Sequence, residues 1–200
     1  MTQGAPPLPQ PWPDDARLDP ELLAHGDTRN VEDRYRYWRV EEIRRDMHLQ
    51  SFNLEIAVEN LERDYNLGTI VRNANAFNVR RVHLIGRRQW NKRGAMKTDT
   101  YLDIVYHQTI EDFLHSVQEH QKIAIDNIGE TTPLHKTRFP EKCVLIFGSE
   151  GSGISDELLR YVDQRVEIPQ FGSTRSINVG VASGILMYKW VEDQILSKKQ

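Results

Sequence analysis

The residues Asn66 to Phe77, NLGTIVRNANAF, place an arginine in the middle of a segment that otherwise has the pattern of a buried helix. Apolar residues recur at helical spacing and predict one apolar face, made of Leu67, Ile70, Val71, Ala74 and Phe77. On this helix Arg72 has only small or uncharged neighbours three and four positions away. An arginine without an acidic neighbour leaves room for an anion. An ion pair with a carboxylate elsewhere in the fold explains the residue equally well.

A second stretch, LIFGSEGSGIS, carries three glycines directly after an apolar run. Glycines at the end of a strand allow backbone N–H groups to come close to a ligand. A nucleoside-triphosphate loop needs lysine and then serine or threonine after its last glycine, where this chain has Ile154. A dinucleotide loop has the order G-x-G-x-x-G, and Glu150 would repel its pyrophosphate. The loop suits a ligand without phosphate, such as an adenosine derivative, and a plain glycine turn is the alternative.

A third stretch, residues 166–188, combines a short strand ending at Pro169 with a helix that we expect to begin at Ser176. The first turns of this helix contain Gly180 and Gly184. Each glycine in a helix interior costs about 1 kcal/mol relative to alanine. Their presence indicates that a ligand or another backbone comes very close, and close packing of two helices would also explain them.

The elements that must position these residues alternate, from residue 54 onward, between short apolar runs and amphipathic helices. This alternation predicts an α/β fold with a mostly parallel sheet, and pattern alone favours a doubly wound one. We expect strands at 54–60, 81–86, 122–127, 143–148 and 165–169, and helices at 66–77, 110–121, 155–162 and 177–195. Thr109 and Ser155 are the expected N-caps of two helices.

The N-terminal part differs from the rest in composition. Six of the nine prolines lie in the first twenty residues, so we expect residues 1–29 to be disordered. The following residues, 30–49, have the pattern of a charged helix with an apolar stripe. We therefore divide the chain into a disordered segment 1–29, a helical extension 30–53 and a main domain 54–200.

Composition limits the class of function. The net charge of −3 argues against a protein that coats nucleic acid by bulk charge, so any RNA contact needs a local basic patch. The segment GRRQWNKRGAMK supplies one candidate patch, whose members are Arg87, Arg88, Trp90, Lys92, Arg93 and Lys97. A solvated basic loop is the alternative. We see no apolar run long enough for a membrane span, no signal peptide and no metal-ligand spacing, and we expect a cytoplasmic protein without a metal.

The three stretches resemble, in order and spacing, the three motifs of the SpoU (TrmH-like) branch of the SPOUT RNA methyltransferases. The motifs are N-x-G-x-I-x-R-x-A-x-A-F at 66–77, F-G-S-E-G-x-G-I-S at 147–155, and I-P followed by S-[LI]-N-V-x-x-A at 168–182. Asn78 stands where the family usually has glycine, and Gln170 where methionine is common. Asparagine tolerates a left-handed turn.

The resemblance implies an α/β knot, with a deep C-terminal trefoil knot around a mostly parallel sheet, and a homodimer packed beside the helix of Gly180 and Gly184. It also implies S-adenosyl-L-methionine as the cofactor and a ribose 2'-hydroxyl of tRNA or rRNA as the methyl acceptor. The implied catalytic residues are Asn66, Arg72, Glu150, Ser176 and Asn178. The implied cofactor-binding residues are Asn127, Phe147, Gly148, Ile168, Gln170 and Ile177.

Arg72 would then bind an RNA phosphate beside the target ribose. A guanidinium group stays protonated in proteins, so we favour phosphate binding and stabilisation of the developing alkoxide, and leave a role as general base open. Two other classes of protein compete with this interpretation. One is an RNA-binding SPOUT-fold protein without methyl transfer, and the other is a dinucleotide-dependent oxidoreductase, which the missing glycine pattern disfavours.

Overall fold

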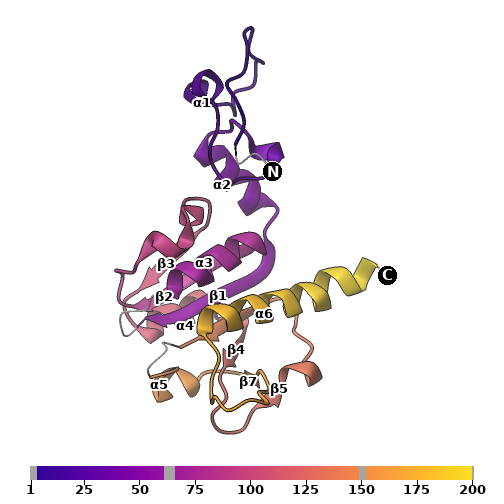
Figure 1. Ribbon diagram of the computed structural model, residues 1–200. Coiled ribbons are helices and arrows are strands. Elements are labelled where there is room, and N and C mark those ends of the chain that lie inside the picture. The colour runs from indigo at the N-terminus through magenta and orange to yellow at the C-terminus, as the bar shows by residue number, and fades with distance from the viewer. Residues whose placement is uncertain (1–3, 61–65, 149–151, 200) are drawn as a thin grey trace. The chain divides into compact units, whose positions relative to one another are not determined.

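The computed structural model describes residues 4–60, 66–148 and 152–199. The chain divides into two compact units, Met1–Gln50 and Ser51–Gln200, which are considered separately (Figure 1). The expected three-part division at residues 29 and 53 stays a prediction.

The N-terminal unit contains helix α1 (Pro20–His25), a 3-10 turn (Asp33–Tyr35) and helix α2 (Val40–Leu49). The predicted continuous helix over 30–49 is therefore wrong in its first half. Tyr37 adopts a φ of 63°, outside the helical range, and its N–H donates to the buried carboxylate of Asp27 at 3.0 Å. Burial alone raises the pKa of Asp27, but hydrogen bonds from Arg29 and Tyr37 lower it to about 2. The turn at Tyr37 therefore separates the 3-10 turn Asp33–Tyr35 from helix α2.

The second unit is built on one seven-stranded sheet in which every recorded pairing is parallel. The spatial order is β3-β2-β1-β6-β4-β7-β5. The strands are β1 (Phe52–Asn60), β2 (Val79–Gly86), β3 (Ile104–His107), β4 (Gln121–Ile125), β5 (Thr132–Pro133), β6 (Cys143–Phe147) and β7 (Gln164–Glu167). The predicted mostly parallel α/β sheet is confirmed, and the pattern missed only the two short edge strands, β3 and β5.

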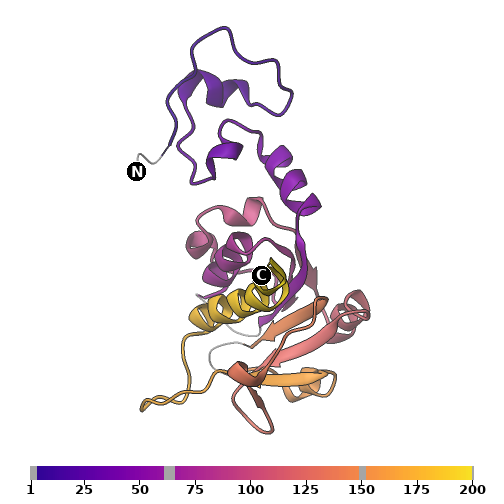
Figure 2. The same cartoon turned by 90° about the vertical axis from the view of Figure 1, so that its right-hand side faces the viewer.

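Helices cover both faces of this sheet (Figure 2). The core under α3 (Leu67–Ala76) and α6 (Val179–Val191) is separate from the one under α4 (Ile110–Ser116) and α5 (Asp156–Leu159). Short turns complete the unit: Lys92–Ala95, Thr98–Thr100, Leu134–Lys136, a π-helical turn at Glu192–Leu196, and Ser197–Lys199. In the described ranges no helix combines the length and apolarity needed to cross a membrane.

The four predicted helices begin within two residues of the observed starts, but α4, α5 and α6 end three to five residues earlier than predicted. Thr109 and Ser155 accept hydrogen bonds from the backbone N–H groups of Asp112 and Leu158, which confirms both N-caps. Asn78 has a φ of 48°, the left-handed turn expected of it. The last helix begins later than predicted, because the side chain of Asn178 caps it.

The small residues of α6 pack against α3. A Cβ added to Gly180 would lie 2.9 Å from Cγ2 of Thr69, and one added to Gly184 would lie 3.3 Å from Nδ2 of Asn73. The Asn73 amide also donates to the carbonyl of Gly180 at 2.9 Å and to Oγ of Ser183 at 3.0 Å. Close packing of two helices therefore accounts for the glycines, as the sequence allowed.

A chain of buried polar side chains lies on the opposite face of the sheet, beside Phe113 of α4. Nε2 of His83 is 2.8 Å from Oε2 of Glu55, and Nδ1 of His83 is 2.8 Å from Nε2 of His107. His120 lies 3.7 Å from the same carboxylate. Burial raises the pKa of Glu55, but the hydrogen bond from His83 and the nearby charges lower it overall, whereas burial lowers the pKa values of His107 and His120.

These shifts predict that the fold loses stability in mild acid. The unfolded chain protonates its histidines near pH 6.5, whereas folded His107 and His120 resist protonation, so the unfolded state binds more protons as the pH falls through this value. The lowered pKa of Glu55 contributes only nearer its unfolded value of 4.5, below this window. Melting temperature should therefore fall between about pH 7.5 and about pH 5.5. His107→Gln keeps a donor toward His83 and should reduce the dependence of the melting temperature on pH. An unchanged dependence would contradict this account.

Candidate active site

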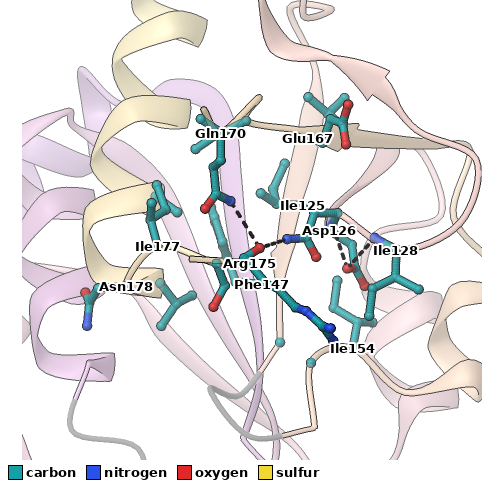
Figure 3. Close-up of a pocket in the computed structure, with 18 of the residues that line it drawn as sticks. Ile125, Asp126, Ile128, Phe147, Ile154, Glu167, Gln170, Arg175, Ile177 and Asn178 are labelled. Atoms are coloured by element: carbon teal, nitrogen blue, oxygen red, sulfur yellow. Dashed lines mark hydrogen bonds between the residues drawn. The ribbon is translucent and has the colours of Figure 1, made fainter. Parts of the chain in front are cut away.

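A cavity of about 1190 Å³ opens at the carboxyl ends of β4, β6 and β7 (Figure 3). Since parallel strands end at the same edge of a sheet, three loops that are distant in sequence meet there. All six residues expected to bind the cofactor line this cavity, namely Asn127, Phe147, Gly148, Ile168, Gln170 and Ile177. The structure brings these residues together, and their role in binding stays a prediction.

Gly148, directly after β6, lies in close backbone contact with Gly153 and Ile154. A Cβ built there would lie 2.0 Å from the carbonyl carbon and 2.2 Å from the carbonyl oxygen of Gly153, and 2.4 Å from the N of Ile154. Gly153 has a φ of 69°, which glycine adopts at little cost. Backbone contact in the wall of the cavity thus explains Gly148, and a positive φ explains Gly153, while Gly151 lies outside the described residues.

Two side-chain amides hold the loop that carries the third motif. Asn127 and Gln170 both donate to the backbone carbonyl of Arg175, the latter from Nε2 at 3.4 Å (Figure 3). This bond orients the Gln170 amide, because the reverse orientation would place two oxygens against each other. Its Oε1 is then buried without a hydrogen-bond partner among the described residues.

The cavity fits an adenosine group. Its walls combine the apolar side chains of Ile125, Phe147 and Ile177 with loop backbone, and an orphaned acceptor, Oε1 of Gln170, lies beside it. Pockets for flat, uncharged ring systems are built in this way, from apolar walls and a few placed polar groups. An unsatisfied buried acceptor is costly, so a ligand that donates to it would be favoured.

The polar residues of the first and third motifs meet beside this cavity. Nδ2 of Asn178 donates to Oδ1 of Asn66 at 2.8 Å, and Oδ1 of Asn178 accepts from the N–H of Val181 at 3.2 Å. Ser176 and Asn178 both line the cavity. The hydrogen bond between Asn178 and Asn66 therefore joins the start of α6 to the start of α3.

Arg72 lies on the exposed side of α3, away from the buried face of that helix. Within the described residues, no ion pair or hydrogen bond is recorded for its side chain, so the structure provides no support for the ion-pair alternative. The remaining expected catalytic residue, Glu150, lies outside the described residues.

The candidate basic patch lies in the segment that follows β2. Five of its side chains are exposed, while Trp90 is half-buried and packs against the core; the exposed ones are Arg87, Arg88, Lys92, Arg93 and Lys97. The segment is fixed to α3 by a close backbone contact, since a Cβ on Gly68 would lie 2.8 Å from Cα of Gly94 and from N of Ala95. Gly68, the glycine of the first motif, thus allows the basic segment to pack closely against α3.

Two further residues support the site and were not expected from the sequence. The buried carboxylate of Glu59, at the end of β1, accepts the backbone N–H of Ser155 at 2.7 Å and so fixes the end of the glycine loop. Asn73 joins α3 to α6. A glutamate inside an apolar strand was a signal available in the sequence for the first of these. No group of three or more His, Cys, Asp or Glu in the described ranges could hold a metal ion.

Comparison with known proteins places this geometry in a family. The sequence profile described as the SpoU rRNA Methylase family matches residues 53–188. The chain belongs to this family. The resemblance found in the three motifs is therefore confirmed, and the profile covers every residue expected in the SpoU active site.

Individual relatives agree with this assignment. The tRNA (guanosine(18)-2'-O)-methyltransferase of Escherichia coli (strain K12) is 26% identical over 142 residues, which cover 68% of this chain and 62% of the relative. A solved structure described as giving insight into the 2-OH methylation of C/U34 on tRNA is 27% identical, with a TM-score of 0.63, and covers 70% of this chain and 95% of that one.

The AdoMet-bound rRNA methyltransferase from Sinorhizobium meliloti shares the fold with this SpoU chain, with a TM-score of 0.63 and 24% identity over 80% of this chain and 63% of that one. The chain spans less than two thirds of the length of the Escherichia coli relative.

Proposed function

We propose that the protein is an S-adenosylmethionine-dependent RNA methyltransferase that modifies a ribose 2'-hydroxyl of tRNA or rRNA. The observation that carries the proposal is the cavity at the strand ends, whose lining combines the second and third motif loops and whose edge is joined to the first motif through Asn178 and Asn66. Membership of the SpoU family and the names of its relatives support it.

S-adenosylmethionine, when bound, supplies a methyl group attached to a positively charged sulfur. The part of this chain is to align the acceptor oxygen with that group, and alignment alone can lower a barrier by several kcal/mol. Ser176 and Asn178, at the cavity edge, are placed to orient the ribose, and Asn66 holds the amide of Asn178 in a fixed rotamer. The two loops that follow β6 and β7, which contain Gly148 and Ile168, enclose the adenosine.

Arg72 binds the phosphate next to the target ribose and stabilises the negative charge that develops on the acceptor oxygen. Its exposure and the lack of a recorded partner among the described residues fit this role, because a guanidinium free of carboxylates keeps its five N–H donors for the RNA. Since a guanidinium is a poor base, the proton of the hydroxyl passes to solvent water and not to Arg72.

The basic segment after β2 brings RNA to this site by contacting phosphates. Gly68→Ala would force that segment away from α3, because its Cβ would overlap the backbone of Gly94 and Ala95. We expect RNA affinity to fall about tenfold while affinity for S-adenosylhomocysteine is unchanged. Gly172→Ala, which adds a Cβ into open space, serves as the control. Unaltered RNA binding by Gly68→Ala would show that the placement of this segment is unimportant.

We further propose a homodimer formed through α6. Since its glycines face α3, the surface available to a partner is instead the exposed apolar stripe of Val181, Ile185 and Tyr188, spaced four and three residues apart. Ile185→Glu is expected to convert the dimer to a monomer in sedimentation velocity, whereas Gln118→Glu, after α4, is not. A wild-type monomer, or a dimer that survives Ile185→Glu, would refute this interface.

The remaining parts of the proposal concern topology and location. The C-terminal trefoil knot is proposed because the chain belongs to the SpoU family. A cytoplasmic location fits an enzyme that modifies RNA.

Calorimetry with two ligands tests the cofactor. We expect S-adenosylhomocysteine to bind with micromolar affinity and NAD to show no heat of binding, because the glycine loop lacks the pyrophosphate pattern. Binding of NAD in preference to S-adenosylhomocysteine would favour the oxidoreductase class instead.

A further inference from the structure

Tyr106 lies on β3, at the edge of the sheet, and its ring is exposed. The guanidinium carbon of Arg88 lies over this ring, 5.0 Å from its centroid. In addition, Nε1 of Trp90 donates to the Tyr106 hydroxyl at 3.3 Å. The three side chains therefore form one cluster, which we call the Arg88 platform.

The strand register places the Arg88 platform on the same side of the sheet as Arg72. Leu84 of β2 pairs directly with Tyr106, and paired residues of parallel strands point to the same face. Leu84 belongs to the core beneath α3, the helix that carries Arg72. The next residue, His107, points to the opposite face and contacts Phe113.

The outer surface of Arg88 is free to bind a ligand. Its side chain is exposed, and the described residues give it no ion pair or hydrogen bond besides the contact with Tyr106. Lys92 is different, because Asp99 lies 2.9 Å from its ammonium group and raises its pKa. The Arg88 platform thus presents a flat cation, held in place by an aromatic ring.

We propose that the Arg88 platform binds one unpaired nucleotide of the RNA, with its base stacked on the Arg88 guanidinium. The inference rests on RNA being the substrate. Guanidinium planes and aromatic rings are the groups on which single-stranded bases stack, whereas paired bases do not expose their faces. A contact with phosphate alone would need no aromatic support beneath the charge. The enzyme would therefore select a loop or an end of the RNA and not a continuous duplex.

Binding of two short probes tests the Arg88 platform. One is an oligoadenylate of about eight nucleotides, and the other has the same ribose-phosphate chain without bases. We expect Arg88→Lys, which keeps the charge but loses the plane, to weaken oligoadenylate binding about tenfold and leave abasic binding within about twofold. Tyr106→Leu should act in the same way, and Tyr106→Phe should keep most of the affinity.

The control is Lys136→Gln, an exposed cation that follows β5 at the other edge of the sheet. It should alter neither affinity. If Arg88→Lys lowers both affinities equally, or neither, the site is at most a phosphate contact and the stacking proposal is wrong. If the wild-type protein binds neither probe, the stacking proposal is wrong, whereas the proposed function fails only if no methyl label is transferred to cellular RNA, so the two failures are distinguishable.

Discussion

Arg72→Ala is expected to reduce methyl transfer to RNA by about 10² to 10³, the loss typical of removing one group that stabilises a developing oxyanion. Its melting temperature and its affinity for S-adenosylhomocysteine should match those of the wild type, because the exposed side chain has no recorded partner within the described residues. Single-turnover transfer, thermal melting and calorimetry measure the three quantities. The prediction therefore separates a loss of chemistry from a loss of fold.

Two variants sharpen this test. Arg80→Ala removes an exposed arginine at the start of β2 and should leave the rate unchanged. Arg72→Lys keeps the charge without the planar fork, so it should stay badly impaired if the phosphate is bound by two parallel hydrogen bonds. A melting temperature lowered by more than a few degrees in Arg72→Ala would restore the ion-pair explanation, and near-normal transfer would remove Arg72 from the mechanism.

Gly148→Ala is expected to weaken cofactor binding about 100-fold. Its Cβ would lie 2.0 Å from a backbone carbon of Gly153, so the loop that encloses the cavity must move. A displacement that costs about 3 kcal/mol corresponds to a roughly 100-fold loss of affinity. Calorimetry with S-adenosylhomocysteine measures this loss.

A graded set of alanine variants makes the result interpretable. Gly172→Ala adds a Cβ into open space and should bind normally. Gly153→Ala meets no atom either, but its φ of 69° makes it strained, so an intermediate loss of about tenfold is expected. Full affinity in Gly148→Ala would mean that the cavity beside this loop is not the cofactor site.

The elements nearest the site were predictable because each has a strong local signal. The cap at Thr109 and the parallel strands follow from residue types and periodicity, and the turn at Asn78 was expected because the resembled family usually has glycine there; the structure agrees with all three. The three loops could be assigned to one site only through the resemblance to a family, since spacing along the chain does not say which strands are neighbours.

Other features could not be predicted because they depend on tertiary contacts. The hydrogen bond from Tyr37 to the buried Asp27 overrides the helical periodicity of residues 30–49. Edge strand β3 has four residues, too few for a periodic signal, and Tyr106 was missed with it. The histidine chain assembles from side chains of β1, β2 and β3, which are distant in the sequence.

Direct detection of the modified nucleoside tests the central claim. The protein would be incubated with methyl-labelled S-adenosylmethionine and total RNA from cells that lack the gene, and the RNA would then be digested and analysed by mass spectrometry. We predict a labelled 2'-O-methylnucleoside that disappears with Arg72→Ala. Label on a base would contradict the proposed acceptor, and RNA that binds but gains no label would show that the protein binds RNA without methyl transfer.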